Sequence, residues 1–428
     1  MSFNQGLSGL TASSKNLDII GHNVANANTI GAKSSRGEFA DVYAASLGGN
    51  GVGEIGFGVR LQAVAQQFSQ GSLTPTNNPL DLAIQGLGFF QVQAPNGSTN
   101  YTRNGQFKVD KDGRILNNDG AQLVGYKADD NGNILPATGP ITVPTAGINP
   151  QVTSKISMDY VLDSRETSNT TAINFDDPTT FNRATSVQVF DVQGRPVDMG
   201  MYFKKTGTNT WDMYATANGV SLANTAAVAA TGTAPAIPAA PARVSQIVFN
   251  ADGSLATPAD GNVTLNIPAT TNADNTEKTG AINGVVLNMS AAKQYGESFS
   301  VKALSQNGFA PGQLTEVTVD SKGYVMSKYS NGQFKPTGQI ELAFFRNPQG
   351  LQPLGGNVWG LTSAAGSAVR GSPNSGNFGN LKSSALEESN VDLTKDLVDM
   401  MITQRLYQAN AQTIKTQDQV LQTLINLR

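Results

Sequence analysis

The chain is 428 residues long, with 39% hydrophobic and 14% charged residues and a formal net charge of −3. This length favours more than one domain, and the absence of a basic block argues against a nucleic-acid partner. Cysteine is absent and His22 is the single histidine, which excludes disulfides, thiolate metal sites and multi-histidine metal sites. No stretch approaches the roughly 20 apolar residues that span a bilayer, so no membrane insertion is expected.

The amino-terminal stretch lacks the basic start, continuous apolar run and cleavage site of a secretory signal. Its apolar residues recur at alternating three- and four-residue spacing, which predicts a helix with one apolar face. This face carries Leu7, Leu10, Leu17, Ile20 and Val24. Ser2 and Gln5 fit a capping box at the start of the helix, and the Asn- and Gly-rich run 26–33 is expected to end it.

A glycine-rich stretch, residues 48–58, follows this helix. Gly51, Gly53 and Gly56 match the G-x-G-x-x-G spacing of dinucleotide sites, but such a site needs a strand before it and a helix beginning inside it. The flanking residues predict neither, so no cofactor is expected. We interpret the stretch, together with Gly58, as a hinge or contact loop between the helices and the β-rich body. A simple linker is an equally good interpretation.

The middle of the chain, residues 80–370, predicts antiparallel β-structure in two bodies. Five turns share an Asp or Asn followed three positions later by Gly; the side chain can bond the turn backbone, and Gly can take a positive φ. They begin at Asp110, Asp129, Asp191, Asn250 and Asp320. None continues to the spaced ligands of a calcium loop, so no metal is expected. Alternating strands are predicted at 185–192, 198–205, 210–216 and 340–345, and exposed loops at 223–242 and 268–280.

A second helix is predicted near the end of the chain, with Ser389 and Asp392 as its N-terminal box. Its apolar face carries Leu393, Leu397, Met400, Tyr407, Ile414, Leu421 and Ile425. We expect the two helices to pair. Small and polar residues in the seam, such as Ser14 and Gln404, bury little area, so part of each apolar face needs another cover. Neighbouring copies of the chain are the expected cover.

Candidate catalytic groups are few. His22 lies in the first helical run, where a polar contact on the helix surface is expected. The paired carboxylates Asp129–Asp130 and Glu387–Glu388 lie in a turn and before a helix, and nothing in these contexts raises a carboxyl pKa. No catalytic residue and no enzymatic activity are expected.

Longer motifs resemble a known family. NVANANTIGAKSSRGEFADVY (23–43) and the stretch 389–427 are similar to the signatures of the axial proteins of the bacterial flagellum, and residues 78–92 and 101–126 resemble the β domain shared by the rod and hook members. The signature positions are Asn23, Ala25, Asn26, Asn28, Gly31, Asn390, Val391, Asp392, Gln404, Arg405, Tyr407, Gln408 and Asn410. A large insertion splits this β domain, and its residues 185–216 resemble the outer domain of the hook members.

With the patterns above, the resemblance implies a mixed, mainly β fold with α termini. The N- and C-terminal helices form a coiled-coil-like pair, followed by two antiparallel β domains nested one within the other. The expected parts are a terminal helical inner domain (1–30 and 385–428), a Gly-rich connecting segment with a β arm (31–77 and 371–384), an inner β domain (78–147 and 303–370) and an outer β domain inserted in it (148–302).

The resemblance also implies a structural subunit of the flagellar hook, which self-assembles into a curved tubular polymer and acts as a universal joint transmitting motor torque to the filament. The implied partners are copies of itself in a helical tube, the distal rod, hook cap and hook–filament junction proteins, and the flagellar type III export apparatus. The implied location is extracellular, reached without a cleaved signal peptide. Two alternatives stay open: a distal-rod or hook-associated axial subunit, and a monomeric surface adhesin-like module.

Overall fold

The computed structural model describes residues 2–42, 56, 58–129, 131–225, 240–271 and 277–426, with side chains described from residue 3 to residue 423 within these ranges. The chain divides into two compact units. The first contains Met1–Thr145, Leu314–Lys328 and Phe334–Arg428, and the second contains Ala146–Gln313 and Tyr329–Gln333. The second unit is therefore inserted in the sequence of the first.

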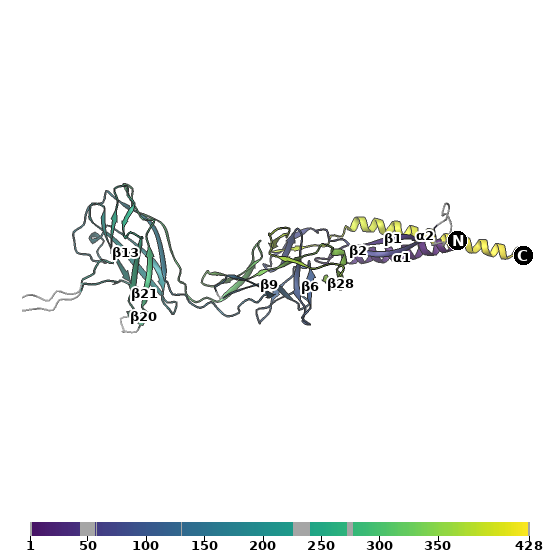
Figure 1. The fold of residues 1–428 in the computed structure, drawn as a ribbon, viewed down its shortest axis with the longest axis horizontal. Coiled ribbons are helices and arrows are strands. Elements are labelled where there is room, and N and C mark those ends of the chain that lie inside the picture. Colours follow the sequence, from purple (N-terminus) through teal and green to yellow (C-terminus); the bar gives the residue numbers. More distant parts are fainter. Residues whose placement is uncertain are drawn as a thin grey trace, which may run out of the picture. The chain divides into compact units, whose positions relative to one another are not determined.

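Two helices and a β arm form one part of the first unit (Figure 1). The helices are α1 (Ser2–Ala25) and α2 (Leu393–Asn426), and the arm pairs β1 (Ser35–Val42) with β2 (Gly58–Gln66) in antiparallel fashion. Both helices lie where the apolar periodicity predicts them. The arm lies along α1 because the Asn23 amide exchanges two hydrogen bonds with the Ser35 backbone, at 2.9 and 2.8 Å.

The rest of the first unit is β-structure. A 13-stranded sheet holds β5 (Phe89–Gln93), β6 (Thr99–Thr102), β7 (Lys108–Val109), β8 (Ile115–Leu116), β9 (Gln122–Ala128), β10 (Ile134–Pro140), β24 (Leu314–Val319), β25 (Tyr324–Tyr329), β26 (Phe334–Ile340), β27 (Leu342–Phe344), β28 (Gln352–Gly355), β29 (Val358–Gly360) and β30 (Val369–Gly371). Two short ladders tie the carboxyl-terminal part of the chain to this body: β32 (Ala385–Glu387) pairs with β3 (Leu73–Pro75), and β31 (Asn380–Ser383) pairs with β4 (Leu82–Gln85). All four strands are antiparallel to their partners, as alternating patterns favour.

The second unit contains two larger sheets. One holds β12 (Arg183–Phe190), β13 (Pro196–Gly207), β14 (Thr210–Ala217), β15 (Val220–Ser221), β16 (Ser245–Phe249) and β17 (Leu255–Thr257); the other holds β11 (Lys155–Asp163), β18 (Asn262–Ile267), β21 (Ile282–Asn288), β22 (Lys293–Tyr295) and β23 (Ser300–Gln306). A further pair is β19 (Thr270–Thr271) with β20 (Glu277–Thr279). The second sheet is mixed rather than purely antiparallel, because β11 pairs in parallel with β21 and β22.

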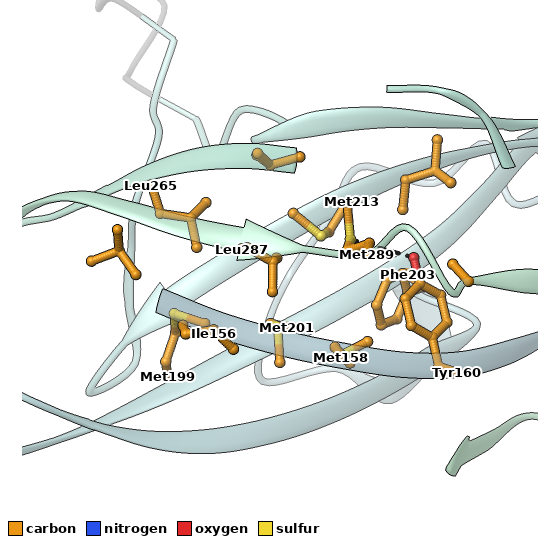
Figure 2. Packing of buried hydrophobic residues seen from close by; sticks show 14 of the residues in the cluster. Ile156, Met158, Tyr160, Met199, Met201, Phe203, Met213, Leu265, Leu287 and Met289 are labelled. Atoms are coloured by element: carbon orange, nitrogen blue, oxygen red, sulfur yellow. Dashed lines mark hydrogen bonds between the residues drawn. The ribbon is translucent and has the colours of Figure 1, made fainter. Parts of the chain in front are cut away.

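Methionines fill much of the core shared by these two sheets (Figure 2). Five are at most 1% exposed, and they come from both sheets and the segment after β21: Met158, Met199, Met201, Met213 and Met289. The Tyr160 hydroxyl lies 3.4 Å from the Met289 sulfur, a polar contact inside this apolar core. Methionine is unbranched and polarizable, so it fills irregular gaps between facing sheets.

The five predicted turns are confirmed. Their glycines have φ values between 76° and 85°. In the first turn the Asp110 carboxylate accepts hydrogen bonds from the backbone of Asp112 and Arg114, at 2.9 and 2.8 Å. A sixth turn of this kind was missed, in which Asn117 accepts from Asp119 and Ala121.

The predicted strands at 185–192, 198–205 and 210–216 correspond to β12, β13 and β14, whereas 340–345 is divided between β26 and β27. The second unit also includes residues 146–147, 307–313 and 329–333 of the expected inner β domain. Residues 303–306, likewise expected in the inner β domain, belong to β23 and pair with β11 of the second unit. Backbone pairing assigns them there because β23 continues from Ser300 without a break. Much of the expected loop at 223–242 lies outside the described residues. Within the expected loop at 268–280, β19 and β20 pair as two short antiparallel strands.

Candidate functional site

The two terminal helices are antiparallel and closely packed. Asn410 of α2 lies beside Gly9 of α1, and Ile414 lies beside Gly6. Towards the other end of the pair, Asn16 donates a hydrogen bond to the Thr403 hydroxyl at 3.1 Å. A Cβ atom on Gly9 would lie only 2.9 Å from the Asn410 amide, so glycine leaves room for the Asn410 side chain against α1.

The seam between the helices is largely polar and small. Among the described residues of the two helices, five are buried: Gly6, Ser13, Ile20, Asn23 and Thr403. Glycine and hydroxyl side chains bring the helices together but bury little apolar area, as the sequence predicts. Part of the apolar surface of both helices therefore remains exposed among the described residues.

The structure divides the predicted apolar face between covered and open positions. Ile20 is buried and five residues are half-buried: Leu10, Leu17, Val24, Met400 and Ile414. Five others are exposed: Leu7, Leu393, Leu397, Tyr407 and Leu421. The backbone of Ile425 lies in α2, but its side chain is outside the described residues. Only part of the expected apolar face is therefore covered within one chain, because α1 covers only the positions that turn towards it.

Sequence reasoning missed a second apolar stripe on α2. Val398, Met401, Ile402 and Leu406 are 45–53% exposed, like Leu397. At about 100° per residue, Val398 and Met401 lie opposite Asn410 and Thr403, the residues that contact α1. Leu397 and Ile402 flank these two, and Leu406 continues the apolar surface towards α1. The sequence signal is a pair of four-residue repeats, 398–402–406 and 397–401. A search for a single apolar face with alternating three- and four-residue spacing does not detect it. We call Leu397, Val398, Met401, Ile402 and Leu406 the outer stripe.

One end of α2 has no α1 residue opposite it. The antiparallel register that places Ile414 beside Gly6 brings α2 level with the start of α1 near Asp418 (Figure 1). Beyond this point Val420 and Leu421 are both 53% exposed. Phe3 and Leu7 at the start of α1 are exposed as well, so this end of the helix pair is also apolar and open.

Gly56 and Gly58 lie beside the start of α1. The sequence predicts a position between the helices and the β body instead. The Gly56 carbonyl accepts a hydrogen bond from Gln5 at 2.7 Å, so Gln5 does not serve the predicted capping box, and α1 already includes Ser2. A Cβ atom on Gly58 would collide with the Ser8 hydroxyl. The arm contacts α1 from Asn23, which bonds Ser35, to Ser8, which accepts the Val59 N–H at 3.3 Å, and this brings Gly58 to the start of α1. Gly51 and Gly53 lie outside the described residues.

Several signature residues have clear structural roles. Asn23 holds the arm, and Asn26 donates to the His22 carbonyl at 2.9 Å. The Asp392 carboxylate caps α2 by accepting the backbone N–H groups of Thr394 and Lys395, at 3.0 and 3.1 Å. Five others are exposed: Ala25, Asn28, Gln404, Arg405 and Gln408. Val391 is half-buried immediately before α2, and Gly31 is buried.

Asn390 joins segments that are far apart in the sequence. Its side-chain oxygen accepts the Ser34 N–H at 2.7 Å, and its NH₂ group donates to the Gln67 carbonyl at 2.7 Å and the Ser69 hydroxyl at 2.8 Å. One amide therefore satisfies backbone groups on both sides of the β arm. The sequence placed Asn390 in the family signature but gave no indication of these partners.

A buried charge cluster lies next to Asn390, and sequence reasoning missed it. The Glu387 carboxylate pairs with Lys33 at 2.5 Å and with Arg103 at 3.0 Å, and the three side chains are at most 4% exposed. Lys33 also donates to the Ser69 carbonyl at 2.8 Å, and Gly71 N–H donates to Glu387 at 3.0 Å. We call Lys33, Arg103 and Glu387 the charge cluster.

Burial dominates the titration of two groups near the helix pair. Desolvation, assisted by the neighbouring Arg103 cation, lowers the pKa of Lys33 although Glu387 opposes the shift. Burial raises the pKa of Asp396 against the hydrogen bond from Asn23, and the nearby Asp399 adds to the rise. Lys33 lies where the segment after α1 meets the β body, and Asp396 lies between α2 and Asn23 of α1.

A cavity of about 500 Å³ lies between α1, the arm and the β28–β29 hairpin. Its lining includes Ile19, Val64, Phe68 and Trp359, with His22 on the helix side. Trp359 is fixed by a hydrogen bond from its indole N–H to Gln66 at 2.5 Å. The cavity therefore separates part of the helix–arm assembly from the β body of the same unit.

Across the described ranges, no three His, Asp or Glu side chains gather in a way that could hold a metal ion. Neither α1 nor α2, as far as they are described, contains an apolar stretch suited to crossing a bilayer. What the geometry offers is a set of packing surfaces centred on the two helices.

Four family models match consecutive parts of the chain. Residues 3–33 match the flagella basal body rod protein model, 83–159 the flagellar hook protein FlgE/F/G D1 domain, 161–309 the flagellar basal body protein FlaE D2 domain, and 382–427 the flagellar basal body rod FlgEFG protein C-terminal model. Lys33, Arg103 and Glu387 thus each lie in a different matched segment. The two helices, strands β5–β10 of the 13-stranded sheet and most of the second unit lie in matched segments.

Relatives extend the match to the whole chain. The flagellar hook protein FlgE of Escherichia coli K12 is 39% identical over 100% of both chains, and that of Rhizobium meliloti is 32% identical over 99% of this chain and 98% of its own. The fold resembles the crystal structure of the Helicobacter pylori flagellar hook protein FlgE2, with a TM-score of 0.51 and 13% identity, covering 73% of this chain and all of that one. The chain belongs to the flagellar hook protein FlgE family and is a structural subunit of the flagellar hook.

Proposed function

We propose that copies of this chain polymerise through their terminal helices into a hollow, curved tube that transmits motor torque as a universal joint. The observation that carries the proposal is the outer stripe of α2. Its five apolar side chains adjoin one another on α2 and are each about half exposed in the single chain. Contiguous apolar surface of this kind marks an interaction site in a soluble chain.

The energetics favour a second copy as the cover. Fully burying a Leu, Ile, Val or Met side chain stabilises by about 1.5–3 kcal/mol, so completing the burial of five half-exposed ones is worth several kcal/mol per contact. The open end at Phe3, Leu7, Val420 and Leu421 adds a second uncovered apolar surface on the same helix pair. Two separate surfaces on one subunit support an extended polymer rather than a closed dimer.

The wider role follows from family membership. We propose that the chain is exported by the flagellar type III apparatus without a cleaved signal, reaches the outside of the cell, and contacts the distal rod, hook cap and hook–filament junction proteins at the ends of the tube. Terminal segments that order only on docking would keep the subunit from polymerising before export. The role is mechanical, and we propose no catalytic activity.

The test compares Ile402→Asp with Gln412→Asp in the purified full chain. Both substitutions place a carboxylate on an exposed position of α2, but only the first lies in the outer stripe. Ile402→Asp should raise the concentration needed for polymerisation at least about tenfold, because a charge would be buried between copies, whereas Gln412→Asp should have a small effect. Sedimentation gives the concentration, and electron microscopy gives the shape of the polymer.

Each outcome discriminates. Curved hollow tubes from the wild-type chain support the hook assembly, and straight tubes would favour the distal-rod or hook-associated alternative. Stable monomers with protease-resistant termini would favour the adhesin-like module. Unchanged polymerisation of Ile402→Asp would show that the outer stripe is not the interface.

A further inference from the structure

We propose that the charge cluster sets the order in which the terminal segments dock: the C-terminal segment, residues 385–390, docks first, and the N-terminal segment, residues 31–34, docks only onto it. The proposal rests on the proposed function only in taking docking of the termini to accompany assembly. The cluster joins positions 354 and 284 residues apart in the sequence, so it forms only when both segments reach the β body.

Charge imposes the order. Arg103 is anchored in the β body, where its guanidinium donates to the Gly86 carbonyl at 2.9 Å and lies 5.4 Å from the centre of the Phe89 ring. Glu387 docking on Arg103 makes a neutral pair. Lys33 docking on Arg103 without Glu387 would place two cations together in a buried site, and unpaired buried charge is strongly destabilising. Only the carboxylate makes the site acceptable to Lys33.

The backbone hydrogen bonds favour the same docking order as the charges do. The C-terminal segment has its own contacts with the β body and the strand preceding it: β32 pairs with β3, the Ala385 N–H donates to Asp81 at 3.2 Å, and the Glu388 N–H donates to Ser72 at 2.9 Å. None of these contacts involves residues 31–34.

The N-terminal segment, in contrast, depends on the C-terminal one for three of its polar contacts. The Gly31 N–H donates to the Glu387 carbonyl at 2.8 Å, the Ser34 N–H donates to the Asn390 side chain at 2.7 Å, and Lys33 pairs with the Glu387 carboxylate. The C-terminal segment can therefore form its ladder before the N-terminal segment arrives. In the reverse order the Gly31 and Ser34 N–H groups lose their acceptors and Lys33 loses its carboxylate, while the Lys33–Ser69 and Gln67–Ser34 hydrogen bonds remain to tie residues 31–34 to the end of the β arm.

The test is amide hydrogen exchange on the full chain with Glu387→Gln, Lys33→Met and the double variant. Glu387→Gln should speed exchange of the Gly31 and Ser34 amides on the order of a hundredfold, because two buried cations lose their carboxylate. Lys33→Met preserves the Arg103–Glu387 pair, so exchange across 385–390 should stay within about threefold of wild type. Adding Lys33→Met to Glu387→Gln should restore protection of Gly31 and Ser34 at least about tenfold, since it removes one of the two cations.

Three outcomes would overturn the docking order: unchanged Gly31 and Ser34 amides in Glu387→Gln, loss of protection at 385–390 in Lys33→Met equal to that at 31–34, or no recovery in the double variant. Amides of β13 and β14 in the second unit are the internal reference for global unfolding. Sedimentation of the same samples reports polymerisation separately. Failure to polymerise with the asymmetry intact would count against the proposed function alone, and wild-type segments unprotected in both monomer and polymer would overturn the docking order.

Discussion

Gly31 lies directly against the backbone of Asn104: a Cβ atom on Gly31 would be 2.7 Å from the Asn104 amide nitrogen. Gly31 has a φ of +71°, and its N–H donates to the Glu387 carbonyl. A side chain at this position would be strained by the backbone conformation and would meet atoms of another backbone segment. Glycine therefore lets the N-terminal segment pass between the β body and the C-terminal segment.

Gly31→Ala should lower the free energy of unfolding of the first unit by about 2–4 kcal/mol, combining the cost of a positive φ with the steric conflict. Hydrogen exchange of the amides of residues 26–34, recorded on the full chain at increasing denaturant concentration, measures the change. Gly21→Ala is the matched control, because Gly21 is helical and has open space around its Cβ position. This control should stabilise α1 by about 0.5–1 kcal/mol. Equal effects of the two substitutions would contradict the close approach at Gly31.

Asp392→Ala should destabilise the first turn of α2. The substitution removes the acceptor for two backbone N–H groups, those of Thr394 and Lys395, and loss of an N-cap costs about 0.5–2 kcal/mol. Amide exchange in residues 394–398 should accelerate, while residues 408–416 of the same helix serve as an unaffected reference. Asp392→Ser should retain most of the protection, since serine is also a good N-cap. If serine fails as alanine does, the carboxylate has a role other than capping.

Lys33 predicts a pH dependence of the first unit. Its pKa is lowered in the folded chain, chiefly by burial, so the folded state releases this proton at a lower pH than the unfolded state does. The unfolded state binds more protons in that window, and stability rises with pH until the ordinary lysine pKa near 10.5 is passed. The free energy of unfolding of the wild type should therefore increase relative to that of Lys33→Met as the pH rises towards 10.5. Denaturant unfolding at several pH values checks the slope, and a difference that shrinks with pH would mean that Glu387 outweighs burial.

Asp163 predicts an acid transition in the second unit. The Arg165 Nε and Nη2 groups each donate a hydrogen bond of 2.9 Å to the Asp163 carboxylate. These bonds lower the pKa of Asp163 to about 2. A depressed carboxyl pKa gives stability that is present above the ordinary value of 3.8 and is lost as pH falls through the folded value. Wild type should exceed Asp163→Asn in its denaturation midpoint above about pH 4, and the two should converge towards pH 2. A constant difference across this range would assign the effect of the substitution to packing.

The two pairings made by Glu387 illustrate why the charge cluster could not be predicted. Each residue alone reads as an ordinary charge: Lys33 lies in an Asn- and Gly-rich run, Arg103 follows a strand, and Glu387 precedes a second Glu. Burial of all three depends on a chain path that brings three distant segments together. Periodicity and turn chemistry act over a few residues and contain no information about such a path.

What the sequence determined by itself is local. The apolar repeat determined α1 and α2, and the Asp/Asn–Gly pairs determined the turns, because each signal acts within a few residues along the chain. Only the tertiary structure decided which face of α2 is covered by α1, that β11 pairs in parallel with β21, and that Lys33 meets Glu387. The physical reason is that a helix or turn is stabilised by neighbours in sequence, whereas the partners of a face, a strand edge or a buried charge are selected by packing of the whole unit.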